Sequence, residues 1–351
     1  MKDNIRLLIT LLVCSFLPGL SSSTAINSEH YVMGFGSCLT EKREQPIWSA
    51  IKEENLQEFF FMGDNVYGDN EETGELDDMK VAYALQREKL PDWLKEIKVN
   101  AIWDDNDYGK NDGGEEYLFK EEAQELFLDF WQAPLDDPRR NREGIYFSEV
   151  REIFNLKVNL IGLDTRYHRS ALGQKDKPYS PVADESKTML GKVQWNWLEK
   201  ELSQNNDLNI IVSSIQVIPT NHGFEKWGNF PHERSRLLKL IEDSKVPTII
   251  VSGDRHKAGI YKKGDVIELT SSSMNKPLPN YISKIWDLLN KETDAHLIGD
   301  MYYPENYGIL SINKNGEILI ELKDINGKTC LLYTSDAADD MQCVDLGGRR
   351  I

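Results

Sequence analysis

The stretch TIIVSGDRH, residues 248–256, is an apolar, β-branched run that stops abruptly in Ser, Gly, Asp254, Arg255 and His256. Six further apolar runs also end in glycine or polar residues, at 31–35, 59–62, 99–103, 158–163, 210–212 and 266–269. Short continuous apolar runs bounded by turn residues are typical of strands that are buried on both faces. The sequence therefore predicts a buried sheet whose strands end in polar side chains.

Helical patterns lie between these runs, at residues 46–56, 77–90, 114–132, 193–203 and 234–243. Strands that alternate with helices predict an α/β fold. In such folds, ligand-binding groups gather beyond the carboxyl ends of the strands, so the polar residues that end the runs are the expected site. Asn315-Gly316, within an alternating stretch at 309–325, predicts a closing β-hairpin.

The composition limits the classes of function. The chain has 351 residues, with 41 Lys and Arg against 58 Asp and Glu, and a formal net charge of −17. With 40% apolar and 28% charged residues, it has the composition of a globular protein. We expect no nucleic-acid-binding surface, because phosphate backbones require clusters of Lys and Arg. Any anionic ligand must be held locally, by metal ions or by a few basic side chains.

Both ends differ from the rest of the chain. Residues 1–25 combine a basic start, an apolar run and a small-residue site ending at Ala25, which predicts a signal peptide and a secreted or periplasmic protein. The alternative is a membrane anchor, for which the apolar run is short; after signal removal we expect no membrane segment.

Residues 330–351 resemble translated sequencing-adapter read-through, the alternative being a polar native tail. The predicted domain therefore covers residues 30–329.

Metal-ligand side chains collect at the predicted strand ends. Cys38 is the one cysteine outside the predicted signal and tail. The set comprises Cys38, Asp64, Asn65, Asp104, Asp105, Asp254 and His256. Carboxylates suit Ca, Mg or Mn, whereas thiolate and imidazole suit Fe or Zn, so the mixture indicates more than one metal. The sequence contains no Gly-x-Ser-x-Gly elbow, Walker loop or dinucleotide-binding fingerprint.

Six motifs together resemble the PhoD-like alkaline phosphatases, which belong to the calcineurin-like metallophosphatase superfamily. They occur in family order between about residues 31 and 275: Gly36-Ser-Cys38, Gly63-Asp-Asn-Val-Tyr-Gly68, Trp103-Asp-Asp-Asn-Asp-Tyr-Gly-Lys-Asn-Asp112, Leu163-Asp-Thr-Arg166, Trp227-Gly-Asn-Phe-Pro231 with Arg234, and Ser252-Gly-Asp-Arg-His256. The resemblance implies an α/β fold in which two mixed β-sheets pack as a sandwich flanked by helices.

The resemblance also implies a metal site with Fe(III) and Ca(II), although other divalent metals remain compatible. Cys38 and Asp64 match ligands of the first metal. Tyr83 is the matching tyrosine ligand, with Tyr67 as the alternative. Residues in the family's other metal-binding motifs are Asp104, Asn111, Asp254 and His256. Arg166 is expected to bind a phosphate oxygen, the alternative being a structural ion pair with a carboxylate.

One residue departs from the family pattern. Many relatives have Asp-Asp-His where this chain has Asp104-Asp105-Asn106, and that His is the natural proton donor to a leaving alkoxide. Asn donates hydrogen bonds but transfers no proton near neutral pH, so either His222 replaces the donor or the enzyme favours leaving groups that need no proton. The sequence thus predicts a secreted metallophosphatase that hydrolyses phosphate monoesters, diesters or both with metal-activated water. The alternative is a non-catalytic protein that binds metal and phosphate.

Overall fold

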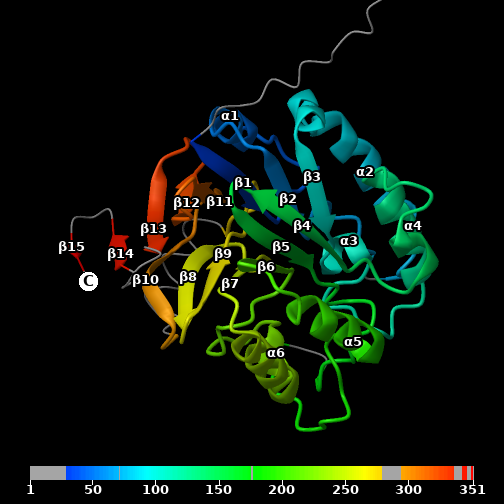
Figure 1. The fold of residues 1–351 in the computed structure, drawn as a ribbon. Helices are drawn as coiled ribbons and strands as arrows, with labels where there is room; N and C mark the ends of the chain where they lie inside the picture. Colours follow the sequence, from blue (N-terminus) through cyan, green and yellow to red (C-terminus); the bar gives the residue numbers. More distant parts are fainter. Residues whose placement is uncertain are drawn as a thin grey trace, which may run out of the picture.

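Two mixed β-sheets lie face to face, with helices on their outer sides (Figure 1). The computed structural model describes residues 29–70, 72–174, 177–278 and 294–335, and the backbone of 342–345 and 349–350. The predicted signal peptide, residues 1–25, lies outside the described residues. None of the helices in the described part of the chain has the length and apolarity needed to cross a membrane.

The first sheet has the strand order β15-β14-β13-β12-β11-β1-β2-β3. Its three parallel strands are β1 (His30–Gly36), β2 (Glu58–Met62) and β3 (Lys98–Ile102). Antiparallel strands extend it on the side of β1: β11 (Asn306–Asn313), β12 (Ile318–Asp324), β13 (Thr329–Ser335), β14 (Gln342–Asp345) and β15 (Arg349–Arg350). The β11–β12 pair is the predicted hairpin.

The second sheet has the order β10-β8-β9-β7-β6-β5-β4. Its parallel centre consists of β5 (Leu156–Gly162), β6 (Leu208–Ser213), β7 (Thr248–Ser252) and β9 (Val266–Thr270). Antiparallel strands complete it: β4 (Phe147–Ile153), β8 (Ala258–Lys263) and β10 (Leu297–Tyr302).

Helices cover the outer face of each sheet (Figure 1). Those beside the first sheet are α1 (Ile47–Glu53), α2 (Asp77–Lys89) and α4 (Lys120–Phe130). Those beside the second sheet are α5 (Gly191–Leu202) and α6 (Pro231–Ser244). The short helix α3 (Asp105–Tyr108) follows β3, and three 3₁₀ segments complete the set: η1 (Asp92–Glu96), η2 (Pro138–Asn141) and η3 (Trp227–Asn229).

The alternation of side chains along β6 explains the continuous apolar runs. Ile210 and Val212 pack in the core between the two sheets, whereas Ile211 packs in the core beneath α5 and α6. Successive side chains of a strand point to opposite faces. Because one face of this strand meets the other sheet and the other face meets helices, the consecutive residues Ile210, Ile211 and Val212 are all apolar.

The predicted α/β class and sandwich of two mixed sheets are confirmed. The sequence reading missed β4 and β8. In β4, positions such as Val150 and Glu152 are exposed, and β8 ends in Lys262 and Lys263. Neither strand is therefore an uninterrupted apolar run.

The end of the predicted domain at residue 329 falls inside the first sheet. β13 begins at Thr329 and pairs with β12 as far as Ser335. Tyr333 is 2% exposed and belongs to the main core. Residues 330–335 therefore form part of the first sheet in this structure, although the predicted domain ends at residue 329, and the assignment of residues 330–351 to a non-native tail stays a prediction.

Candidate metal and active site

The candidate ligands lie where the carboxyl ends of strands from both sheets meet. Cys38, Asp64 and Asp104 follow β1, β2 and β3, whereas Asp254 and His256 follow β7. Four of the five have left-handed backbone conformations, with φ of 57° at Cys38, 55° at Asp64, 67° at Asp254 and 51° at His256. Such conformations are uncommon outside glycine and cluster at functional sites, where the surrounding fold enforces them.

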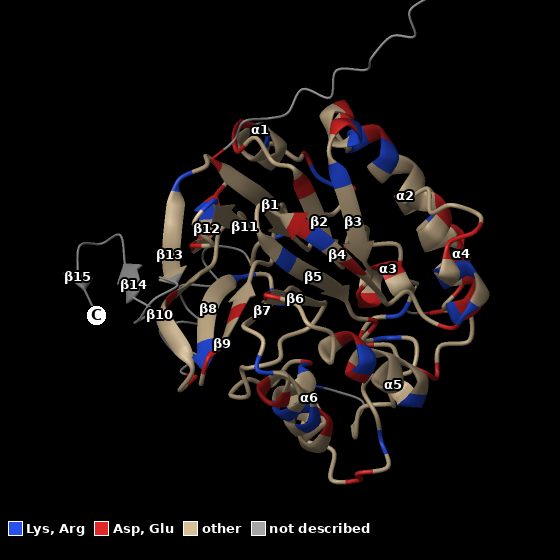
Figure 2. Ribbon diagram, in the orientation of Figure 1, with Lys and Arg blue, Asp and Glu red and all other residues tan. Residues whose placement is uncertain are grey.

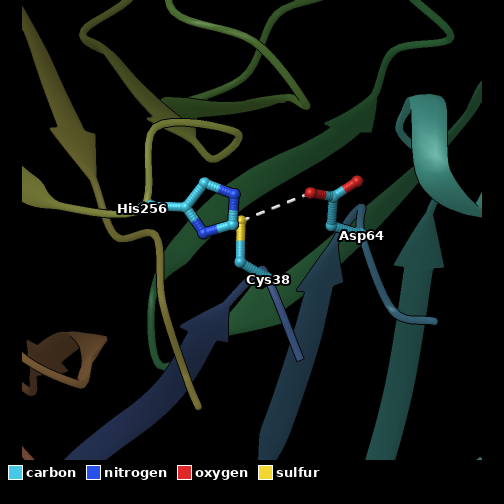
Figure 3. Close-up of side chains that lie close together, drawn as sticks. All are labelled: Cys38, Asp64 and His256. Atoms are coloured by element: carbon cyan, nitrogen blue, oxygen red, sulfur yellow. Dashed lines mark hydrogen bonds between the residues drawn. The ribbon is translucent and has the colours of Figure 1, made fainter. Parts of the chain in front are cut away.

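The first group brings a thiol, a carboxylate and an imidazole together (Figure 3). One ligand atom from each of Cys38, Asp64 and His256 lies within 4.8 Å of the others. The Cys38 thiol donates to Asp64 Oδ2 at 3.5 Å and also contacts Ser272 Oγ at 3.0 Å. The His256 Nδ1–H donates to the carbonyl of Lys276 at 2.6 Å, which leaves Nε2 as the nitrogen available to a metal.

A tyrosine joins this group, and it is Tyr67. Its hydroxyl donates to Asp64 Oδ2 at 2.7 Å, and its side chain is 5% exposed. Tyr83, the first choice from the sequence, lies on α2, and its hydroxyl donates to the backbone carbonyl of Asp107 at 3.4 Å. The structure therefore places the alternative tyrosine, rather than Tyr83, beside the thiol and carboxylate.

The second group consists of three carboxylates, from Asp64, Asp104 and Asp105, whose ligand atoms lie within 4.8 Å of one another. Burial raises the pKa of Asp64 well above its usual value, and the neighbouring carboxylates of Asp105 and Asp107 raise it further. Burial likewise raises the pKa of Asp254, followed by repulsion from Asp105 and Asp64. Such a concentration of buried negative charge requires compensation by protons or by cations.

The structure supports metal binding through one unsatisfied atom. Asp104 is fully buried, and its Oδ1 accepts from Arg166 Nε at 2.7 Å and from Ser214 Oγ at 2.5 Å. Its Oδ2 has no hydrogen-bond partner among the described residues. A buried carboxylate oxygen without a partner is costly unless a cation binds it. Thiol, phenol, imidazole and carboxylate donors together fit one softer and one harder metal ion.

Asn106 binds the ligand carboxylates. Its side-chain amide donates to Asp64 Oδ1 at 3.0 Å and to Asp105 Oδ1 at 2.9 Å. Both amide hydrogens are therefore engaged by carboxylates. The same bonds lower the pKa of Asp64 against the effect of burial, so Asn106 favours the ionised form of a ligand.

Arg166 is buried beside the carboxylate of Asp104. Its side chain is 0% exposed and forms ion pairs with Asp104 and with Glu225, the latter at 2.6 Å. It is absent from the lining of the cavity described next. The contact of Arg166 with a phosphate oxygen stays a prediction, whereas the alternative, an ion pair with a carboxylate, describes its position in this structure, where the guanidinium pairs with the buried Glu225.

A cavity of about 250 Å³ opens onto the candidate ligands. Its lining includes Asp64, Asp105, Asn106, Asn111, Asp254 and His256. Asn111 is exposed, and its amide donates to Asp112 Oδ2 at 2.9 Å. Burial, followed by the charge of Lys276, lowers the pKa of His256 to about 4, so its imidazole is neutral at neutral pH and able to bind a metal.

His222 lies elsewhere. It lines a separate cavity of about 280 Å³ with Tyr179, Lys226 and Arg234, and it is absent from the lining of the cavity that opens onto the ligands. Burial, followed by the charges of Arg255 and Lys226, lowers its pKa well below the usual value. A neutral imidazole outside the cavity is poorly placed to supply a proton to a leaving group.

Asp107 positions the backbone beside the candidate ligands, and the sequence analysis did not identify it. Its carboxylate accepts from the backbone N–H of Asp104 at 2.6 Å, of Asp64 at 3.1 Å and of Asn65 at 3.3 Å. It thereby ties the ends of β2 and β3 together beside the ligands. The signal was available as Asp104-x-x-Asp107, the spacing of a capping box at the start of α3.

A family model and three solved structures relate this chain to known proteins, the model by family and the structures by fold. A model of the PhoD-like phosphatase family matches residues 95–323. The structure of PhoD is 16% identical, with a TM-score of 0.71 over 88% of this chain and 70% of that chain. GAP50, the anchor in the inner membrane complex of Plasmodium, is 13% identical, with a TM-score of 0.59 over 89% and 90% of the two chains.

A third solved structure is the purple acid phosphatase PPD1 from yellow lupin seeds. It is 10% identical, with a TM-score of 0.57 over 86% of this chain and 52% of that chain. No curated protein matches this chain by sequence. At these identities, each structural similarity shows a shared fold only. Cys38 and Asp64 precede the region matched by the family model, so their assignment as ligands depends on the geometry above.

Proposed function

Because the chain belongs to the PhoD-like phosphatase family, we propose that it is a metal-dependent phosphatase that hydrolyses phosphate monoesters, diesters or both with water as the nucleophile. The observation that carries this proposal is the pair of candidate ligand groups that share Asp64, a residue that lines one cavity together with Asp105 and His256. Two metal ions beside each other are a recurrent means of hydrolysing phosphate esters.

The donor atoms divide into two chemical types. Cys38, Asp64, Tyr67 and His256 would hold the softer ion, for which we propose Fe(III). Carboxylates of Asp64, Asp104, Asp105 and Asp254 would hold the harder ion, for which we propose Ca(II). When bound, these ions lower the pKa of water and neutralise charge that develops on the phosphoryl oxygens.

The protein residues position the ligands. Arg166 and Ser214 donate to Asp104 Oδ1, which leaves Oδ2, the oxygen without a partner among the described residues, available to a cation. Asn106 holds the carboxylates of Asp64 and Asp105 at a fixed separation. Because these partners are buried or half-buried, the ligands keep their orientation without reorganisation at the moment of reaction, which is the condition for electrostatic catalysis.

Among the described residues, the site offers no evident side chain to donate a proton to the leaving group. The one histidine in the lining is His256, a candidate ligand, and the position of the family's histidine is occupied by Asn106. We therefore propose that the enzyme favours esters of acidic alcohols, such as aryl phosphates, whose leaving groups need no proton.

A non-catalytic protein that binds metal and phosphate is the second candidate. The engagement of both Asn106 amide hydrogens by carboxylates favours it, because Asn106 then has no hydrogen left for a substrate. Phosphate release from an aryl phosphate, measured on protein purified without chelators and analysed for metals, separates the two. Release that requires bound metal supports the phosphatase, whereas full metal occupancy without release supports the binding protein.

We also propose that the protein is secreted or periplasmic, with cleavage of the signal peptide near Ala25. Sequencing the amino terminus of protein recovered from the expressing cells tests this. A mature protein that retains residues 1–25 would contradict it.

A further inference from the structure

Four cations line the cavity that opens onto the candidate ligands. They are Lys177, Arg255, Lys257 and Lys276, against three lining carboxylates, those of Asp64, Asp105 and Asp254. The chain as a whole carries a formal charge of −17, and its outer helices α2, α4 and α6 carry both signs (Figure 2). An excess of cations in the lining of this cavity is therefore a local feature, opposed to the net charge.

Aromatic rings hold these cations in place. The Arg255 guanidinium lies 4.4 Å from the centre of the Phe224 ring, and the Lys177 ammonium lies 5.5 Å from the same centre. The Lys276 ammonium lies 3.1 Å from the centre of the Tyr67 ring. Cations over aromatic faces are stabilised without losing their charge, so these groups remain able to attract an anion.

The two lysines differ in their neighbours. Lys177 is 41% exposed and pairs with Asp112 Oδ2 at 3.0 Å, an atom that also accepts from the Tyr179 hydroxyl at 2.8 Å. Lys276 has no carboxylate within ion-pair distance in the described part of the chain. One lysine thus shares its carboxylate with a tyrosine, and the other has no carboxylate partner among the described residues.

The number of positive charges in the cavity lining exceeds the number of negative charges on a single phosphoryl group. A phosphate monoester carries at most two negative charges, and the lining carboxylates are the groups that we assign to metal ions. Lys177 and Lys276 then line the space left for the substrate, with Lys177 sharing Asp112 with Tyr179. The exposed ring of Phe224, at 37% exposure, offers an apolar surface between two of the four cations for the carbon skeleton of the alcohol part.

We propose that the cavity contains a subsite for a second anionic group, so that the enzyme selects phosphate esters whose alcohol part itself carries a negative charge. Lys177 and Lys276 contact that group, and Phe224 packs against the carbon skeleton that joins it to the phosphate. This inference rests on the proposed phosphatase function and specifies its substrate class.

Two isosteric substrates test the subsite. 4-Carboxyphenyl phosphate and 4-carbamoylphenyl phosphate have nearly the same shape and differ in one charge. We expect kcat/KM to be higher for the carboxylate, and the ratio between the two substrates to fall about fivefold in Lys177→Met and in Lys276→Met. Lys239→Met removes an exposed lysine on α6 and should leave the ratio unchanged. The ratio should also fall as ionic strength rises, because salt screens the attraction.

The outcomes distinguish this inference from the proposed function. Equal hydrolysis of both substrates by the wild type, or a ratio that survives in both lysine variants, overturns the subsite and leaves the phosphatase intact. Hydrolysis of neither substrate overturns the phosphatase. In that case calorimetric binding of the corresponding benzylphosphonates, with and without the carboxylate, still decides the subsite: a preference lost in the lysine variants supports it, and equal binding rejects it.

Discussion

The side-chain amide of Asn106 donates to Asp64 Oδ1 at 3.0 Å. Its second hydrogen goes to Asp105 Oδ1 at 2.9 Å. Asn106 therefore bridges two candidate ligand carboxylates. A residue that holds two carboxylates must donate hydrogen bonds to them, whereas a general acid must transfer a proton to the leaving group. Substitution of Asn106 therefore affects the two roles differently.

Asn106→His should raise the rate on alkyl phosphates relative to aryl phosphates. Histidine can protonate an alkoxide, and general acid catalysis is typically worth ~10²–10⁴-fold, whereas nitrophenolate leaves without a proton. The ratio of kcat/KM for the two substrate classes isolates this effect from the loss of the bonds to Asp64. His222→Ala is the matched control, and it should leave the ratio unchanged because His222 lines another cavity. A selective loss on alkyl phosphates in His222→Ala would identify it as the donor.

Asp64→Ala and His256→Ala should each remove bound metal and lower the rate of phosphate release. Loss of a residue that only hydrogen-bonds to a metal ligand typically costs ~10–100-fold, and we expect the loss of a ligand itself to cost more. Asp64 belongs to both ligand groups, so its loss should lower the content of both metals. Asp77→Ala, at an exposed carboxylate on α2, is the control. Elemental analysis together with phosphate release checks the result, and full metal content in either variant would refute the assignment.

Tyr67→Phe and Tyr83→Phe separate the two candidate tyrosines. An iron–phenolate or iron–thiolate site absorbs visible light, and Tyr67 and Cys38 are the residues beside Asp64. Tyr67→Phe and Cys38→Ser should therefore weaken or shift the visible band. Tyr83→Phe should leave it unchanged, since that hydroxyl contacts a backbone carbonyl. A colourless, iron-free and active wild type would contradict the iron assignment.

The metal-free protein should lose stability as pH rises. Burial raises the pKa of Asp107 to about 7, although backbone N–H groups oppose this shift. The folded state therefore binds more protons than the unfolded state between the unfolded pKa and about 7, and the free energy of unfolding falls over that range. Between about pH 5 and 7.5 this group alone costs on the order of 2 kcal/mol.

Urea unfolding of chelator-treated protein at the two pH values measures this slope. Asp107→Asn should reduce the slope, because the titrating group is gone, while lowering stability through weaker acceptance of the backbone N–H groups. A slope of opposite sign in the wild type, or an unchanged slope in Asp107→Asn, would contradict the prediction.

Tyr333→Ala should destabilise the fold by about 3–5 kcal/mol, the usual cost of removing a buried aromatic side chain. Tyr333 is 2% exposed on β13 and belongs to the main core. Tyr333→Phe is the control and should cost much less. Thermal unfolding checks both. An unchanged melting temperature in Tyr333→Ala would show that residues 330–335 contribute nothing and would restore the boundary at residue 329.

Strands that follow from short local stretches of sequence could be predicted. Apolar runs that end in polar residues identified β1, β2, β3 and β7, and their carboxyl ends bring Cys38, Asp64 and His256 together. The ends of β1 and β2 meet because parallel strands of one sheet share an edge, whereas His256 reaches them from β7 of the second sheet, a juxtaposition that depends on how the two sheets pack.

Features that depend on long-range packing were not predictable. Arg166 turns inward because Glu225, 59 residues later, is buried beside it. His222 lies away from the ligands because the chain after β6 carries it into a separate cavity. Tyr67 and Tyr83 both follow Asp64, but the hydroxyl of Tyr67 returns to its carboxylate, whereas Tyr83 lies on α2 and contacts the backbone carbonyl of Asp107. No periodicity or motif contains this information.

The two sheets contribute different ligands, and this has a mechanical consequence. Cys38, Asp64 and Asp104 follow strands of the first sheet, whereas Asp254 and His256 follow β7 of the second. A metal ion bound by both sets is a cross-link across the middle of the sandwich. Sliding one sheet against the other would then stretch metal–ligand bonds. A metal that binds more tightly would therefore make the sandwich more resistant to shear, and shear would weaken metal binding.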